Sequence, residues 1–414
     1  MKVNTERLKS RFFRYVEIWS QSEDGVEDRY PSTPQQLEFA AILEADLRAM
    51  GLTDVKLDEH GYVTATLPAT PGYEGQPVVG LLAHYDTYPG VSGKHVKPIV
   101  HVYDGTDIAL PDDPEVIIKA KENPELAKFV GEEIITASGT TLLGADDKAG
   151  LAEILEAVAM MMEQPALIHP TIRLGFTPDE EVGMGTAHFD VEGFGAHVAY
   201  TFDGSTMGEV ENETFSADGA VIKITGRDVH PGYAKNKMIN AARVAARFIE
   251  CIPQGLSPEC TEGREGYLHP VHLVADTSTA TITYIVRDFT VEGLERLEAY
   301  LHLLAESLQR EFEGSKIEVQ IKEQYRNMIY HLDVEPRAIE FAMKAVNMTG
   351  IEARLLSIRG GTDGARLSAL GLPTPNIFAG GVNFHSKFEW VAVRAMEMAV
   401  LSAIKIAQVW AEEG

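Results

Sequence analysis

Cysteine is scarce in this sequence. Of the 414 residues only Cys251 and Cys260 are cysteines, and no Cys-x-x-Cys pair occurs. Two thiols cannot form the disulfide framework of a small secreted protein, and they leave no thiolate cluster for a metal. The sequence therefore favours a protein of a reducing compartment.

Long apolar runs are also absent. No run reaches the ~18 residues that a membrane-spanning helix requires. The first residues, Met1–Arg11, lack the uninterrupted apolar stretch of a signal peptide. We therefore expect a cytoplasmic protein that does not insert into a membrane.

Positive charge is in deficit. The chain has 36 Lys and Arg residues against 62 Asp and Glu residues, a formal net charge of −26. Such a protein repels phosphate backbones and anionic membranes, which argues against nucleic acid and membrane surfaces as partners. The remaining composition, 45% hydrophobic and 24% charged, is typical of a globular protein. The length allows roughly two or three domains.

Short apolar segments alternate with helical patterns over much of the chain. This order predicts an α/β fold with a mixed, mostly parallel sheet covered by helices. We expect strands at 78–83, 172–177, 198–202 and 376–379. A helix is expected after Gly144, where apolar residues recur every three or four positions. Its polar faces would carry Glu153 and Glu156.

A self-contained pattern interrupts this order between residues 216 and 325. Strands are expected at 220–226, 280–288 and 316–322, with a further strand near 271–274, and helices at 236–252 and 292–312. Thr290 would cap the second helix. The pattern predicts a small α/β sandwich, residues 216–325, inserted into a larger domain formed by residues 1–215 and 326–414.

Acidic and histidine side chains stand at the ends of the predicted strands and at the start of the Gly144 helix. They are His84, Asp86, Asp146, Glu180, Glu181, Asp203 and His385. In open α/β sheets the carboxyl ends of the strands form the ligand site. These side chains are therefore expected to converge on one crevice.

The donor atoms of this set are nitrogen and oxygen, a combination that suits Zn²⁺, Mn²⁺ or Co²⁺. His84 and Asp86 are two residues apart, so in an extended segment they share a face and Asp86 can orient the imidazole. Glu180 and Glu181 are adjacent and point apart, so one can bind metal while the other acts as a general base. Each motif alone is equally compatible with a capped turn or an exposed acidic surface.

The motifs that carry these residues are distinctive as a set. They are the segments Leu82–Thr87, Leu143–Gly150, Phe176–Gly183, Thr201–Gly204, His230–Gly232, Ile358–Gly364 and Gly371–Asn376. Together they resemble the motifs of the dizinc aminopeptidases and deacylases of the M20 metallopeptidase family. The resemblance extends over essentially the whole chain.

The resemblance implies a zinc-exopeptidase-like catalytic domain and an inserted lid or dimerisation domain. It also implies two Zn²⁺ ions per subunit, with Mn²⁺ or Co²⁺ as substitutes. Asp146 would bridge the two ions. His84 and Asp203 would complete one metal site, and Glu181 and His385 would complete the other.

The activity implied by the resemblance is hydrolysis of the N-terminal peptide bond of tripeptides, with Glu180 as the general base and Asp86 as the carboxylate behind His84. His230 would donate to the oxyanion in the active site of a partner subunit, within a homodimer. The alternative for His230 is the capping of a turn before a helix. Asn383, close to His385 in the sequence, is included among the substrate-binding residues.

Arg359 lies in a glycine-rich segment, Arg359–Gly364, where a substrate can approach the backbone closely. A guanidinium offers two parallel hydrogen bonds to a carboxylate, so Arg359 is a candidate clamp for the C-terminus of a short peptide. The alternative is a structural ion pair with Asp363 or a neighbouring acid.

Two other functions remain open at this point. A related M20-type dipeptidase or N-acyl amino acid deacylase would use the same metal centre on a different substrate. A peptide-binding protein without catalysis is disfavoured, because the positions of the base and the five metal ligands all carry competent residue types.

Overall fold

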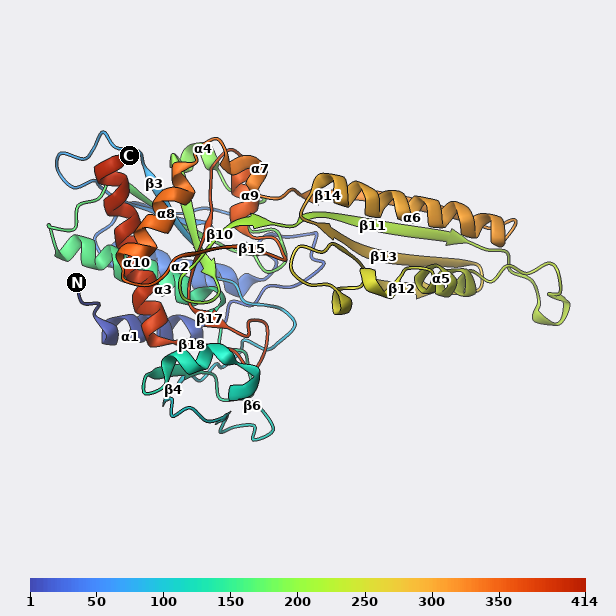
Figure 1. Cartoon of the computed structure of the whole chain (residues 1–414), viewed down its shortest axis with the longest axis horizontal. Coiled ribbons are helices and arrows are strands. Elements are labelled where there is room, and N and C mark those ends of the chain that lie inside the picture. The colour runs from blue at the N-terminus through green and yellow to red at the C-terminus, as the bar shows by residue number, and fades with distance from the viewer. The chain divides into compact units, whose positions relative to one another are not determined.

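The computed structural model describes residues 1–414, which divide into two compact units (Figure 1). The larger unit comprises Met1–Asn212, His331–Leu356 and Thr362–Gly414. The inserted unit comprises Glu213–Tyr330 together with Ser357–Gly361. The segment Ser357–Gly361 carries Arg359, and the sequence contained no sign that it would join the inserted unit.

The larger unit is built on an eight-stranded mixed sheet with the order β1-β2-β8-β3-β9-β16-β10-β15. The strands are β1 (Thr53–Leu57), β2 (Val63–Leu67), β3 (Val79–His84), β8 (Ile172–Thr177), β9 (Val198–Gly204), β10 (Glu209–Thr214), β15 (Arg354–Ile358) and β16 (Asn376–Phe378). The central strands β8, β3, β9 and β16 are parallel, whereas β1, β2 and β10 pair antiparallel. This confirms the predicted mixed α/β fold and its four predicted strands.

Six helices pack against this sheet or against one another: α1 (Thr5–Glu17), α2 (Pro34–Ala49), α3 (Ala145–Glu163), α8 (Arg337–Met348), α9 (Asp363–Ala369) and α10 (Val393–Glu413). Two short helices are also present, α4 (Val191–Phe194) and α7 (Ile329–Leu332), and α7 spans the boundary between the two units. No helix is long and apolar enough to cross a membrane. Helix α3 packs on β3 and β9 and also contacts α1 and α10, so protein surrounds it.

The predicted polar faces of α3 are wrong. Glu153 and Glu156 are both 0% exposed, because α1 and α10 cover the sides of the helix that the sheet leaves open. Glu156 pairs with Arg7 of α1 at 2.7 Å. Neither carboxylate oxygen of Glu153 has a hydrogen-bond partner, and burial raises its pKa well above the usual value.

A small second sheet with the order β17-β18-β7-β4 lies in the same unit. Its strands are β4 (Ile99–Val102), β7 (Glu133–Thr136), β17 (Gly381–Val382) and β18 (Trp390–Ala392), and a separate pair is formed by β5 (Ile108–Ala109) and β6 (Ile117–Ile118). Two 3₁₀ turns, Ala120–Glu122 and Pro124–Phe129, follow β6. Strand β18 follows His385 and strand β7 precedes α3, so the pairing of these two strands holds the two segments next to each other.

The inserted unit is a four-stranded antiparallel sheet with the order β12-β13-β11-β14, packed against two helices (Figure 1). Its elements are β11 (Ser216–Thr225), α5 (Ala241–Glu250), β12 (Tyr267–Ala275), β13 (Thr279–Asp288), α6 (Val291–Glu311) and β14 (Lys316–Tyr325). Short 3₁₀ turns occur at Pro231–Tyr233, Gln254–Leu256 and Pro258–Cys260. Every predicted element is present, and the hydroxyl of Thr290 accepts a hydrogen bond from the Gly293 N–H at 3.0 Å, as expected of a cap. Helix α5 begins later than predicted, because Asn240 caps it.

Candidate metal centre

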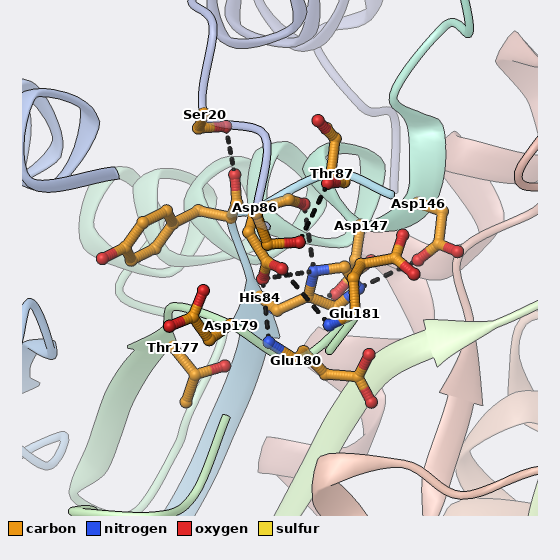
Figure 2. A network of polar contacts seen from close by, with 12 residues as sticks. Ser20, His84, Asp86, Thr87, Asp146, Asp147, Thr177, Asp179, Glu180 and Glu181 are labelled. Atoms are coloured by element: carbon orange, nitrogen blue, oxygen red, sulfur yellow. Dashed lines mark hydrogen bonds and ion pairs between the residues drawn. The ribbon is translucent and has the colours of Figure 1, made fainter. Parts of the chain in front are cut away.

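The predicted metal ligands lie together at the carboxyl ends of the parallel strands. They are His84 at the end of β3, Asp203 near the end of β9, Glu181 after β8, Asp146 at the start of α3 and His385 after β17. Parallel strands deliver their carboxyl ends to one edge of a sheet, which explains how His84, Glu181 and Asp203 meet here. Asp146 and His385 come instead from segments that follow β7 and β17 of the small second sheet. Figure 2 shows the polar contacts around His84, with Asp146 and Glu181 beside it.

Asp146 faces the two histidines with different oxygens. Its Oδ1 lies 2.9 Å from Nε2 of His84, and its Oδ2 lies 3.1 Å from Nε2 of His385. Asp203 approaches the first histidine, with 3.5 Å between its Oδ1 and Nε2 of His84. Glu181 approaches the second, with 2.7 Å between its Oε2 and Nε2 of His385. The five side chains thus form two groups that share Asp146.

Two sets of three side chains have donor atoms close enough for a metal ion, and both sets include His84. Ligand atoms of His84, Asp146 and Glu181 lie within 4.8 Å of one another. The same holds for His84, Asp147 and Asp203, so the structure adds Asp147 to the acids around His84. Oε1 of Glu181 is buried and has no hydrogen-bond partner. An orphaned, buried carboxylate oxygen of this kind is costly unless a cation or a water satisfies it.

The charges of the cluster are unbalanced. Burial raises the pKa of Glu181 to about 8 and that of Asp203 to about 7. Against the effect of burial, Asp146 and Glu181 raise the pKa of His385 to about 11. Three carboxyl groups, those of Asp146, Glu181 and Asp203, face the two imidazoles. Divalent cations would restore the balance, and the nitrogen and oxygen donors fit zinc or a similar ion.

Asp86 connects the first histidine with the segment that follows β8. Its Oδ1 lies 3.3 Å from Nδ1 of His84 and accepts a hydrogen bond from the Glu180 N–H at 3.0 Å. Its Oδ2 accepts from the Glu181 N–H at 3.2 Å. The backbone carbonyl of Asp86 also lies 3.2 Å from Nδ1 of His84. Asp86 is fully buried, so its carbonyl and carboxylate together fix the histidine and both glutamates in one rigid group.

Glu180 and Glu181 point apart, as expected for adjacent residues. Figure 2 shows the carboxylate of Glu181 on the side of Asp146, whereas that of Glu180 extends in another direction. Burial raises the pKa of Glu180 well above its ordinary value, and the nearby Asp203 adds to this shift. A carboxyl with a raised pKa is suited to accept and release a proton near neutral pH.

Two further buried carboxylates hold these loops and were missed by the sequence analysis. Asp179 accepts hydrogen bonds from the backbone N–H of Ser32 at 2.5 Å and from Nε2 of Gln36 at 2.7 Å, which fixes the start of the Glu180 loop. Glu389 accepts three backbone N–H groups from the turn before and at Asp146. The only signals in the sequence were that Asp179 immediately precedes Glu180 and that Glu389 follows His385 by four residues.

His230 and Arg359 belong to the inserted unit. His230 is exposed, and its Nδ1 accepts a hydrogen bond from the Gly232 N–H at 3.2 Å, a turn-capping contact. Arg359 does not pair with an acid. Its Nη1 donates to the carbonyls of Gly263 and Glu265 at 2.8 and 2.9 Å, and its Nη2 donates to Oγ1 of Thr261 at 2.9 Å.

Asn383 lies two residues before His385, in the larger unit. Its Nδ2 donates to Oδ1 of Asn123 at 2.7 Å and to the carbonyl of Phe388 at 3.1 Å. Asn383 also lines a cavity of about 430 Å³ together with Ile118 and other residues. Its amide nitrogen is therefore already engaged, while the cavity beside it has room for a ligand.

The family model for peptidase family M20/M25/M40 matches residues 136–408 of this chain. Two curated relatives are similar over nearly their whole length. Peptidase T of Clostridium botulinum is 45% identical over 402 residues, 97% of this chain and 98% of the relative. Peptidase T of Listeria monocytogenes is 45% identical over 411 residues, 99% of each chain. These matches confirm the resemblance and narrow it, within the family, to peptidase T.

Solved structures of the same fold include aminopeptidase PepT of Bacillus cereus, with a TM-score of 0.76 and 24% identity over 99% of both chains. A tripeptidase of Staphylococcus aureus has a TM-score of 0.78 and 23% identity, covering 99% of this chain and 100% of the other. A dinuclear metal-binding peptidase of Bacillus subtilis has a TM-score of 0.68 and 17% identity over 99% of both chains. The likeness establishes the fold.

Proposed function

This chain belongs to peptidase family M20/M25/M40, and on that premise we propose that it is a metallo-aminopeptidase that releases the N-terminal residue of tripeptides. One observation carries the proposal: Asp146 presents one oxygen to His84 and the other to His385, at 2.9 and 3.1 Å. A carboxylate shared in this way is suited to bridge two metal ions. The chain is similar to peptidase T of Clostridium botulinum, to aminopeptidase PepT of Bacillus cereus and to a tripeptidase of Staphylococcus aureus. These similarities support tripeptides as the substrate class.

Five residues would hold two zinc ions. Asp146 would contribute to both sites, His84 and Asp203 to the first, and Glu181 and His385 to the second. Zinc is proposed because imidazole and carboxylate ligands suit it, with manganese or cobalt as substitutes. When bound, a metal pair of this kind supplies an activated water and polarises the peptide carbonyl.

Glu180 moves the proton in this mechanism. Its carboxylate takes the proton from the attacking water and passes it to the nitrogen of the leaving dipeptide, the usual work of a general base that becomes a general acid. Asp86 keeps the backbone of Glu180 in place and orients the ring of His84 through Nδ1. The base and the ligand therefore keep a fixed relation to each other.

Arg359 is proposed as the clamp for the free C-terminus of the tripeptide. A guanidinium carries five N–H groups. Three are used by Gly263, Glu265 and Thr261, which leaves Nε–H and one Nη2–H for a ligand. Two donors on one guanidinium can bind the two oxygens of a carboxylate. The existing bonds would hold the guanidinium in place for this contact.

His230 is proposed to donate to the oxyanion that forms as the peptide bond is attacked. By resemblance to the family it would do so in the active site of a partner subunit, which makes a homodimer part of the proposal. The inserted unit would then serve as lid and dimerisation domain, and Asn383 would contact the substrate. Light scattering of the purified protein measures whether it is a dimer. If it is a monomer at the concentrations of the assay, His230 cannot reach the active site of a partner subunit.

We further propose that the enzyme acts in the cytoplasm on short peptides; the scarcity of cysteine and the resemblance support this. The experiment that tests the function compares tripeptides, dipeptides and N-acetyl amino acids as substrates of the zinc-loaded protein. Fastest release of the N-terminal residue from tripeptides is expected. Preference for dipeptides or for N-acetyl amino acids would assign the chain to a related dipeptidase or deacylase instead.

A further inference from the structure

Glu389 occupies an unusual position next to the metal centre. Its side chain is only 1% exposed. Oε2 accepts hydrogen bonds from the backbone N–H groups of Leu143 and Gly144, at 2.7 and 2.8 Å. Oε1 accepts from the backbone N–H of Asp146 at 3.1 Å. One carboxylate thus binds three N–H groups of the turn that leads into α3.

The two ends of this contact carry different metal ligands. Glu389 follows His385 by four residues and immediately precedes β18, where Trp390 pairs with Thr136 of β7. The bound turn ends at Asp146, and its Gly144 has a φ of +80°, a conformation that side-chain-bearing residues rarely adopt. The turn therefore depends on specific contacts for its shape. Glu389 connects the backbone of this turn to the segment of His385, in addition to the contact between the side chains of Asp146 and His385.

We propose that Glu389 is a positioning residue that sets the spacing between Asp146 and His385, and so the affinity of the metal site that these residues form with Glu181. The inference rests on the proposed dinuclear centre. The first site depends less on Glu389, because His84 and Asp203 are held by β3 and β9 of the main sheet. Loss of Glu389 should therefore weaken the two sites unequally.

A carboxylate is required here because three donors converge on it. In Glu389→Gln the single oxygen is expected at the position of Oε2, where two N–H groups meet. The new NH₂ group then faces the N–H of Asp146, so a donor opposes a donor. The perturbation is localised at the residue that bridges the metals, while the volume of the side chain is unchanged.

The chain offers a matched control in Glu153. It is a glutamate on α3, the helix that begins next to the bound turn, is fully buried, and neither of its oxygens has a hydrogen-bond partner. Glu153→Gln makes the same chemical change in the same region without touching the turn at Asp146. It separates the removal of a buried carboxyl from the removal of the Glu389 contacts.

The test is a zinc titration of metal-free wild type, Glu389→Gln and Glu153→Gln against a chromophoric chelator, with thermal unfolding of each metal-free protein. We expect Glu389→Gln to retain one site and to bind the second ion roughly 10- to 100-fold more weakly, the usual effect of losing a residue that orients a ligand. Glu153→Gln should bind both ions like wild type. Metal-free Glu389→Gln should unfold at a somewhat lower temperature than wild type, because the opposed donors are buried, but it should be folded at the temperature of the titration.

Two results would overturn the inference: wild-type affinity at both sites of Glu389→Gln, or an equal loss at both sites. Glu389→Asp provides a second variant in case the glutamine protein does not fold, because it keeps the charge but is too short to reach all three N–H groups. Glu389→Asp should also lose more zinc affinity at the second site than at the first. An equal loss of affinity at the two sites of this variant would contradict the proposal. If wild type bound two ions but cleaved no tripeptide, the proposed function would fail and this inference would stand.

Discussion

The backbone N–H of Glu180 donates a hydrogen bond of 3.0 Å to Oδ1 of Asp86. The same oxygen lies 3.3 Å from Nδ1 of His84. One buried carboxylate therefore fixes the proposed base and a proposed metal ligand, although they stand 96 residues apart in the chain (180 − 84). Rigid coupling of this kind holds reacting groups in a fixed relative position and orientation, and such positioning accounts for a large part of enzymatic rate enhancement.

Substitution of the proposed base separates proton transfer from metal binding. Glu180→Gln should keep both metal ions, because Glu180 contributes none of the five ligands. Its kcat on a tripeptide should fall by at least ~100-fold, the lower end of general-base contributions. Steady-state kinetics with elemental analysis of the same sample measure both quantities. A variant nearly as active as wild type would assign the proton transfer to another residue.

The Arg359 clamp predicts selection of peptides with a free C-terminus. A tripeptide acid should be cleaved roughly 10–150-fold faster in kcat/KM than its C-terminal amide, which corresponds to loss of a charge-assisted contact of about 1.5–3 kcal/mol. Arg359→Met should slow the acid to the level of the amide. A tetrapeptide should also lose rate, because its carboxylate is displaced by up to ~3.5 Å.

Thr261→Val is the control for this experiment, since it removes one bond that holds the guanidinium and leaves the guanidinium itself. The preference for the acid should persist in this variant. Equal rates for acid and amide in wild type would show that Arg359 does not bind the C-terminus.

A pH-dependent contribution to stability is expected from Glu335. Nε and Nη2 of Arg337 lie 2.8 and 2.7 Å from its two oxygens, and Nε2 of His197 lies 2.7 Å away. The hydrogen bonds from Arg337 lower the pKa of Glu335 from 4.5 to about 2, against the effect of burial and with the help of His197. The folded state therefore favours the carboxylate. Its stabilising effect is complete above the unfolded pKa of 4.5 and is lost as the pH falls toward 2.

Glu335→Gln should accordingly lower the free energy of unfolding by about 1 kcal/mol near pH 7, a modest value because water screens the partly exposed partners. The difference in the free energy of unfolding between the variant and wild type should be smaller near pH 3. Urea unfolding at pH 7 and at pH 3 measures this difference. A difference that is the same at both values would show that the charge of Glu335 does not stabilise the fold.

The sequence was sufficient to predict the central strands and the place where their ends meet, because buried parallel strands read as apolar runs with polar residues at their ends. His84 and Asp203 could be placed for this reason. The burial of Glu153 and Glu156 could not be predicted, since α1 and α10, which cover them, come from the two ends of the chain. The contacts of Glu389 were equally hidden, because its partners are backbone N–H groups, which leave no mark in a sequence.

The side-chain roles in the inserted unit were harder to predict than its strands. The self-contained pattern of residues 216–325 predicted β11 and β13, whereas the contacts of Arg359 depend on the segment Ser357–Gly361 joining that unit. Nothing in the composition of this short, glycine-rich segment indicates which of the two units it joins. Contacts with residues far away in the sequence determine to which unit the segment belongs.

The most direct test of the dinuclear centre is a zinc titration of the metal-free protein in which tripeptide hydrolysis and bound zinc are measured together. Prolonged chelation should abolish release of the N-terminal residue, and activity should return as zinc is added, reaching its maximum at two ions per chain. Asp146→Ala, which removes the shared ligand, should fail to hold the pair. Full hydrolysis by a sample that elemental analysis shows to contain no transition metal would contradict the account.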